Sequence, residues 1–206
     1  MKVSKLVRWV AVSIACIVIS YFYIDRSVVW YLFEHQARQF FVLKLFAEAI
    51  PLTVLIFIFC FFLYYATKVS RGSVSHLDRR LLLACNAVVI GQFLKEVLKV
   101  VFGRYWPATF VCHNPSLIND QVYGFNWLKF SSAYASFPSG HTTFIFAFSV
   151  SMCFLFARCR WLWILLAILV VIGQIGMYYH FVSDVFAGAL LGSLVGFYAT
   201  RCQPSD

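Results

Sequence analysis

Charged residues are scarce in this chain of 206 residues. Asp, Glu, Lys and Arg together make up 12% of it and only eight side chains are acidic, whereas hydrophobic residues make up 62% and the mean hydropathy is +0.82. Soluble globular domains carry about 25% charged residues, so this composition argues against one. The composition instead predicts an integral membrane protein.

Several other signals are missing as well. The apolar runs lack the two-residue alternation of membrane-spanning strands, which argues against a β-barrel. The seven cysteines lack the spacing of a metal site, and we see neither an internal repeat nor a second domain, so we expect one membrane-embedded domain over residues 1–206. No small-residue cleavage site follows the first apolar run, which we therefore expect to stay as an anchor.

The apolar runs themselves are long enough to cross a hydrocarbon layer of about 30 Å, which takes about 20 helical residues each. The second run carries Lys44, Glu48 and Pro51, so its first part is expected to enter the membrane tilted or along the interface. We predict an all-α, polytopic membrane bundle with six transmembrane helices, near residues 7–24, 40–66, 81–102, 142–157, 161–179 and 182–200.

Basic residues predict the orientation of the bundle. With both termini in the cytoplasm, ten of the seventeen lysines and arginines fall on the cytoplasmic side, as the positive-inside rule requires. These ten are Lys2, Lys5, Arg8, Lys68, Arg71, Arg79, Arg80, Arg158, Arg160 and Arg201. The net charge of +9 then indicates topology and affinity for anionic lipid headgroups, not a nucleic-acid partner. The short connections suggest residence in a bacterial inner (plasma) membrane.

The longest connection, residues 103–137, is rich in aromatic and turn-forming residues. Loops of this length in compact proteins are usually functional or disordered, and tryptophan and tyrosine anchor at membrane interfaces. We therefore expect an ordered outer loop, either an interfacial anchor or a cover over the substrate.

His180 and Asp184 are four residues apart on a segment expected to be helical, so they share one face. A carboxylate beside an imidazole fixes its tautomer and stabilises the positive charge that develops when its other nitrogen attacks an electrophile. A purely structural hydrogen-bonded pair has the same spacing, so the pair alone does not decide between catalysis and structure.

The segment Pro138–His141 precedes another apolar helix. Free backbone amides at a helix N-terminus bind anions, so Ser139 and the Gly140 amide are candidate phosphate ligands. His141 at the same terminus is a candidate general acid. Lys95, Lys99 and Arg104 run out of the third span toward the same side, although lysines there also fit a role in contacting lipid headgroups.

These residues resemble the type-2 phosphatidic acid phosphatases, membrane relatives of the vanadium haloperoxidases. The pattern of that family has three blocks: a lysine, six residues and Arg-Pro; then Pro-Ser-Gly-His; then Ser-Arg, five residues, His, three residues and Asp. Here the second block is complete, and the third keeps His180 and Asp184 at the expected spacing. The resemblance covers most of the chain, with its core motifs in residues 95–184.

Both arginines of the family pattern are absent. Trp106 stands where the first block has arginine, and Gly173 and Gln174 stand where the third has Ser-Arg. Gln174 donates hydrogen bonds without charge, whereas an arginine fork binds phosphate bidentately. We expect Arg104 to substitute, with help from Lys95 or Lys129, while Lys99 matches the family's phosphate-binding lysine.

The resemblance implies a metal-independent lipid phosphate phosphatase without a cofactor. His180 attacks phosphorus to form a phosphohistidine, Asp184 orients it and His141 serves as acid and base. Lys99, Arg104, Ser139, Gly140 and Gln174 are the expected substrate-binding residues, at the outer (periplasmic) face. A lipid phosphotransferase using the same histidine and a non-catalytic lipid-binding relative stay open, and the sequence decides neither the lipid nor the oligomeric state.

Overall fold

A computed structural model describes residues 3–110 and 113–201, so that Lys2 of the orientation argument lies outside the described residues. Within those two ranges the regular structure is helical, apart from three isolated β-bridges in the long loop. The main helices are α1 (Val3–Ile19), α2 (Asp25–Glu34), α3 (Phe41–Lys44), α4 (Ile50–Ser70), α5 (His76–Phe102), α6 (Leu117–Asp120), α7 (Gly140–Leu155), α8 (Arg160–Gly176) and α9 (Val182–Arg201). Short π- and 3-10 turns join several of them, namely η1 (Ser20–Ile24), η2 (Ala37–Gln39), η3 (Leu45–Ala49), η4 (Ser132–Tyr134) and η5 (Ala157–Cys159).

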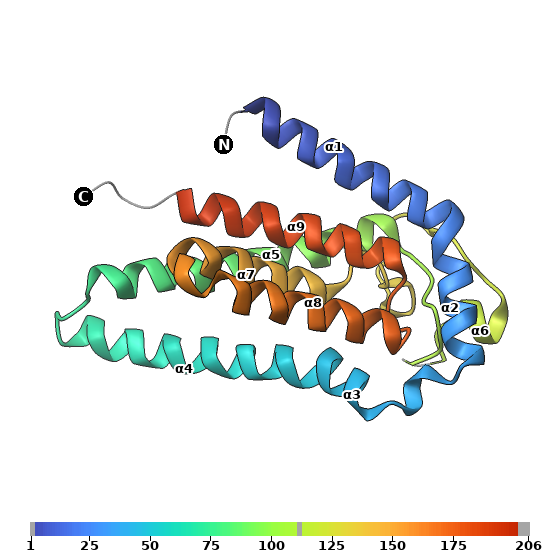
Figure 1. Cartoon of the computed structure of the whole chain (residues 1–206), viewed down its shortest axis with the longest axis horizontal. Helices are drawn as coiled ribbons and strands as arrows, with labels where there is room; N and C mark the ends of the chain where they lie inside the picture. The colour runs from blue at the N-terminus through green and yellow to red at the C-terminus, as the bar shows by residue number, and fades with distance from the viewer. Residues whose placement is uncertain (1–2, 111–112, 202–206) are drawn as a thin grey trace.

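The first helix is longer than the predicted span at residues 7–24. Helices α1 and α2 run on through η1 as one helical segment of 32 residues, Val3–Glu34. Figure 1 shows α1 beside α9 and α2 turned across the end of the bundle. The predicted span coincides with α1 and η1, and the helix continues beyond it into α2, whose Asp25 is fully buried.

Helix α7 lies at the centre and packs against α5, α8 and α9. Gly188, Gly192 and Gly196 on α9 let the two backbones approach closely: a Cβ atom on Gly192 would lie 2.4 Å from the carbonyl oxygen of Thr143. Small residues at four-residue spacing are a common helix interface in membranes. This contact brings the start of α9, which carries Asp184, against the start of α7.

Within residues 3–110 and 113–201, five helical segments are long and apolar enough to cross a membrane: Val3–Glu34, Phe41–Ser70, His76–Phe102, Ala157–Gly176 and Val182–Arg201. Helix α7 is apolar but has only 16 residues, which is about 24 Å of helix and short for a span. The chain is therefore a multi-pass, all-helical membrane protein, while the count of six spans stays a prediction.

The two ends of the bundle differ. Both termini and the turn between α4 and α5 lie toward one end, whereas α2 and α6 lie at the other (Figure 1). The long loop, described over 103–110 and 113–137, is ordered by contacts with its own start. Gly103 adopts a φ of +52°, and a Cβ atom there would lie 1.8 Å from the carbonyl oxygen of Asn126. Only glycine fits this close approach.

Candidate active site

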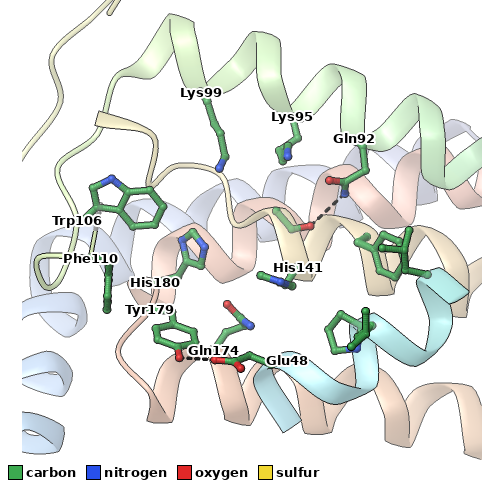
Figure 2. A pocket seen from close by; sticks show the side chains of 15 residues that line it. Glu48, Gln92, Lys95, Lys99, Trp106, Phe110, His141, Gln174, Tyr179 and His180 are labelled. Carbon is green, nitrogen blue, oxygen red and sulfur yellow. Dashed lines mark hydrogen bonds between the residues drawn. The ribbon is translucent and has the colours of Figure 1, made fainter. Parts of the chain in front are cut away.

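A cavity of about 810 Å³ opens between α4, α5, α7 and the turn after α8. It brings together several of the side chains that the sequence singles out, among them Lys99, His141 and His180, as Figure 2 shows. Its lining residues are Glu48, Pro51, Leu52, Leu55, Gln92, Lys95, Lys99, Trp106, Phe110, Gly140, His141, Phe144, Gln174, Tyr179 and His180.

His180 lies in the turn between α8 and α9, where its backbone N–H donates to the carbonyl of Gln174 at 3.4 Å. Its ring is 5% exposed, and Trp106 flanks it at 5.3 Å between ring centroids. Its Nδ1 lies 3.6 Å from Asp184 Oδ2, longer than a hydrogen bond. Nδ1 has no hydrogen-bond partner among the described residues. His180 and Asp184, whose spacing in the sequence predicted a pair, therefore lie next to each other without a hydrogen bond between them.

Burial lowers the pKa of His180, and the negative charge of the neighbouring Asp184 carboxylate only partly opposes that effect. The charge of Lys99 lowers it further. Since histidine ordinarily titrates near a pH of about 6.5, the His180 ring is neutral at physiological pH. A neutral imidazole is the nucleophilic form.

Asp184 is fully buried behind His180 and held from several directions. Its Oδ2 accepts from Ser136 Oγ at 2.7 Å and from the Phe181 N–H at 3.0 Å. Its Oδ1 accepts from Arg104 Nη1. The carboxylate is therefore fixed before any ligand arrives.

Arg104, the expected substitute for the missing arginines, does not line the cavity. It is fully buried, and its guanidinium binds Asp184 through Nη1 and Asp25 Oδ2 through Nη2 at 2.7 Å. Burial alone would lower the pKa of Arg104, but the two carboxylates outweigh it and raise the pKa, so the group stays charged. The arginine turns inward because two buried carboxylates need its charge.

Asp25 completes this buried network from α2. Its Oδ1 accepts from the Ser183 N–H at 2.9 Å, its Oδ2 accepts from Ser183 Oγ, and Tyr123 OH lies 3.0 Å from that same Oδ2. Arg104 also donates to Ser183 Oγ at 2.7 Å and to Tyr123 OH at 3.0 Å. The start of α9 is thereby tied to the first helical segment.

Ser139, also expected at the phosphate, caps α7 instead. Its hydroxyl is fully buried and accepts from the Thr142 N–H at 3.4 Å and from Thr142 Oγ1 at 3.0 Å. Gly140 and His141 do line the cavity, and His141 is exposed there. The helix start thus presents the glycine and the histidine while the serine holds the turn.

The two lysines of α5 form one wall of the cavity, here called the lysine wall (Lys95 and Lys99). Lys95 packs along Gly140, where a Cβ atom would lie 3.1 Å from its Cδ, and its Nζ lies 2.5 Å from Glu96 Oε1. Lys99 Nζ lies 5.7 Å from the centre of the Trp106 ring. Lys99 thus makes a cation–π contact while Lys95 is paired with a carboxylate.

The positions of the two missing arginines both lie on the cavity. Trp106 supplies an aromatic face beside His180, and its Nε1 donates to the Ser132 carbonyl at 2.9 Å. Gln174 is fully buried, and its Nε2 donates to the Ala47 carbonyl at 2.9 Å. One of the two N–H donors of the Gln174 amide is therefore already used within the protein.

Two acidic residues of this arrangement, Asp25 and Glu48, are absent from the site predicted by the sequence. Asp25 holds Arg104, and Glu48 lines the cavity and accepts from Tyr179 OH at 2.6 Å. An available signal was their position inside apolar helices, because ionisable residues in membrane segments are usually functional. Trp106 and Phe110 also show that the long loop contributes to the cavity wall.

Across residues 3–110 and 113–201, no group of three or more His, Cys, Asp or Glu side chains is arranged to hold a metal ion. Metal independence of the reaction stays a prediction.

The fold and the cavity define a class of protein: a helical membrane protein with two histidines and two lysines on one cavity within its bundle. A family model described as the PAP2 superfamily matches residues 80–206, more than half of the chain. The chain belongs to the PAP2 superfamily, which confirms the resemblance drawn from its motifs. No solved structure shows significant similarity to the chain.

Curated relatives share part of the sequence. The chain is 37% identical over 108 residues to the lipid A 1-phosphatase of Rhizobium johnstonii, covering 52% of this chain and 41% of that protein. It is 31% identical over 118 residues to the undecaprenyl-diphosphatase of Sulfolobus acidocaldarius, covering 56% and 51%. It is also 26% identical over 141 residues to the bacitracin transport permease protein BcrC of Bacillus licheniformis, covering 68% and 62%. The matches thus span between about two fifths and three fifths of these relatives' own length.

Proposed function

We propose that this protein is a membrane lipid phosphatase that hydrolyses a phosphate or diphosphate ester through a phosphohistidine on His180. The observation that carries the proposal is the meeting of His180, His141 and Lys99 on one cavity, with Asp184 fixed behind His180. The phosphatase names of relatives similar to this chain support the reaction class.

In the first step, the His180 nitrogen remote from Asp184, Nε2, attacks phosphorus while the bond from phosphorus to the lipid oxygen breaks. Asp184 stabilises the imidazolium that forms, because its carboxylate stands 3.6 Å from Nδ1 and is held by Ser136 and Arg104. Arg104 is proposed here as a positioning residue and not as a phosphate ligand.

His141 gives a proton to the departing lipid oxygen. In the second step it takes a proton from water, which attacks phosphorus and breaks the bond to His180, releasing inorganic phosphate. Gln92, whose Nε2 donates to the Gly140 carbonyl at 3.1 Å, ties the segment that carries His141 to α5.

Charge on the equatorial phosphate oxygens is stabilised by Lys99, with Lys95 beside it, and by the backbone N–H of Gly140. Neither step uses a metal ion or a cofactor. Ser139 contributes through the shape of the helix start, since its hydroxyl is occupied within the turn.

We place the site at the outer (periplasmic) face of the inner membrane, with both termini in the cytoplasm. The distribution of lysine and arginine supports this orientation. The cavity is lined by residues from the starts of α4 and α7 and from the turn after α8. The lipid tail then stays between helices, with anionic headgroups near the basic cytoplasmic segments.

The test is release of inorganic phosphate from phosphorylated lipid A, phosphatidic acid, phosphatidylglycerol phosphate and a polyprenyl diphosphate, by detergent-purified protein without added metal and with a chelator. Wild type is compared with His180→Ala and with His35→Ala, an exposed histidine outside the cavity. We expect release by wild type and His35→Ala and a loss of about 10⁴-fold or more in His180→Ala.

Equal release by wild type and His180→Ala would refute the nucleophile. A phosphorylated second lipid or saccharide in place of inorganic phosphate would indicate a phosphotransferase. Folded wild-type protein that binds these lipids without turnover would indicate a lipid-binding relative.

A further inference from the structure

The side of the cavity opposite the lysines carries acceptors. Glu48 presents its carboxylate there, beside the Tyr179 hydroxyl that donates to it at 2.6 Å. Gln174 lies next to them and is fully buried. Glu48 and Gln174 are here called the acceptor floor, and Figure 2 shows them across the two histidines from Lys95 and Lys99.

The orientation of the Gln174 amide follows from its partner. Its Nε2 faces the Ala47 carbonyl at 2.9 Å, and a carbonyl only accepts, so the nitrogen and not the oxygen must point there. Gln174 Oε1 has no hydrogen-bond partner among the described residues, although the side chain is fully buried and lines the cavity. An unpaired buried acceptor is costly, so this oxygen calls for a donor in the cavity.

The backbone brings Glu48 to this position. A Cβ atom on Gly173 would lie 2.4 Å from the Ala47 backbone nitrogen, so glycine lets the π-helical η3 pack directly on α8. The pair Gly173 and Gln174 thus places η3, with Glu48, at the cavity. The same two positions that lack the family's Ser-Arg build the acceptor floor.

The cavity therefore carries its positive charges on one side and its negative charge on the other, and its net charge is weakly positive. Lys95 is already paired with Glu96, which leaves Lys99 as the more available cation, and Glu48 opposes it from the other side. A phosphate dianion that carries no positive charge of its own is repelled by a nearby carboxylate, which weakens its binding. A ligand that brings a cation with hydrogen-bond donors satisfies Glu48 and Gln174 Oε1 at once.

Aromatic rings complete the surroundings of the acceptor floor. Phe110 and Tyr179 meet edge to face at 5.3 Å between centroids, and Trp106 stands beside His180. Cations of the protein already lie over these rings, because Arg38 is 4.5 Å from the centre of the Phe110 ring and Lys99 Nζ is 5.7 Å from that of Trp106. The rings therefore shape the site and are not counted as partners of a ligand ammonium.

We propose that the cavity selects a lipid phosphate that carries a primary ammonium group a few bonds from phosphorus. The phosphate sits at the lysine wall and the histidines, and the ammonium donates to Glu48 and Gln174 Oε1. This inference deepens the proposed function, on which it rests for the placement of phosphate. Glu48 is then a specificity-determining residue.

The amine has two chemical sources. It belongs either to the lipid part that leaves, as in a 2-aminoalkyl phosphate, or to a small headgroup esterified to the phosphate, as in an aminoethyl phosphodiester. Both place an ammonium beside a phosphoryl group, and the experiment carries one arm for each.

Binding is measured on His180→Ala protein in detergent, so that no turnover intervenes. The probes are a long-chain 2-aminoalkyl phosphonate and an aminoethyl ester of an alkyl phosphonate, each beside its N-acetylated form. We expect the free amine of at least one pair to bind about ten- to a hundredfold more tightly, as a charge-assisted hydrogen bond does. Adding Glu48→Gln reduces that preference to within about threefold.

The matched control is Glu96→Gln, which also removes one carboxylate beside the lysine wall but outside the cavity. It is expected to keep the preference for the amine. Equal binding of free and acetylated amines in both arms overturns the inference, and so does a preference that survives Glu48→Gln.

Turnover of the corresponding phosphates by wild type separates this inference from the proposed function. Release that depends on His180 but ignores the amine overturns the inference alone. The product to be measured is inorganic phosphate for the 2-aminoalkyl phosphate and aminoethyl phosphate for the aminoethyl phosphodiester. An amine preference in binding without release of either product upholds the inference and overturns the phosphatase.

Discussion

Asp184 separates two polar regions of opposite character. Behind it, Arg104, Asp25 and Ser183 form a network closed to solvent, in which both carboxylates and both terminal guanidinium nitrogens have partners. In front of it, on the cavity wall, Gln174 Oε1 has no hydrogen-bond partner within the described residues.

The difference between the buried network and the cavity indicates which polar groups can bind a ligand. Groups that satisfy one another hold geometry, and their charges are not available to a ligand. Polar groups that lack a hydrogen-bond partner at a cavity wall are available to a ligand. Arg104 therefore belongs to the support of the site, and Lys99 belongs to its binding surface.

The largest effect is expected from Arg104→Met, which disrupts the buried network and leaves Asp25 and Asp184 as buried carboxylates without a counter-charge. We expect a loss of about 3–5 kcal/mol in the free energy of unfolding, together with loss of turnover. Reversible unfolding in mixed micelles measures it, with the exposed Arg71→Met as control. Wild-type stability in Arg104→Met would show that the network is dispensable.

Lys99→Met tests the front of the site. We expect kcat/KM to fall about 10²–10³-fold, because a charge that stabilises the transition state is lost, while the free energy of unfolding changes by less than about 1 kcal/mol. Lys95→Met is the matched variant, with a smaller loss because Lys95 is already paired with Glu96. A larger loss in Lys95→Met would reverse their assigned roles.

Gly173→Ala tests the contact that seats η3. The added methyl group would lie 2.4 Å from the Ala47 nitrogen, so η3 must shift, at an expected cost of about 1–3 kcal/mol. Gly91→Ala in α5 is the control, since its Cβ atom would meet neighbours at ordinary distances of 3.5 and 3.7 Å. Thermal unfolding in detergent compares them; equal midpoints would mean that the close contact is relaxed in solution.

The smallest expected effect is a shift in the pH dependence of kcat/KM. His180 must be neutral to attack, and burial lowers its pKa, so activity is retained below a pH of about 6.5 and lost only as pH falls through that lowered pKa. Since Lys99 also lowers this pKa, Lys99→Met moves the acidic limb of kcat/KM toward higher pH. The profile is corrected for the separately titrated substrate phosphate. An acidic limb above the ordinary histidine value in wild type would contradict a neutral, buried nucleophile.

Sequence patterns predicted the helices well because lipid-facing helices must be continuously apolar. Each of the six expected runs coincides with a helix, from the segment Val3–Glu34 to α9. The predicted span near residues 7–24 stops before α2, and the charged residues Asp25 and Arg26 at the start of α2 are a local signal of a membrane boundary. Burial of Asp25 against Arg104 overrides that local signal.

The candidate site was predicted in part. His141, Lys99, Gly140, Gln174 and His180 line one cavity, whereas Arg104 and Ser139 turn into the protein. The catalytic and binding roles of these residues stay predictions. No local pattern separates Lys99 from Arg104, because Lys99 lies in the last turn of α5 and Arg104 comes directly after its end. Which of them faces a ligand depends on partners that are distant in sequence.

The sequence by itself determined an all-helical membrane protein of the PAP2 superfamily with its histidines and Asp184 in motif register. Those features are local: apolar length, helical spacing and short motifs. Only the tertiary structure decided that Arg104 pairs with carboxylates 79 and 80 residues away and that Glu48 faces the lysines across the cavity. The physical reason is that a buried charge takes its role from whichever opposite charge the packed helices bring to it.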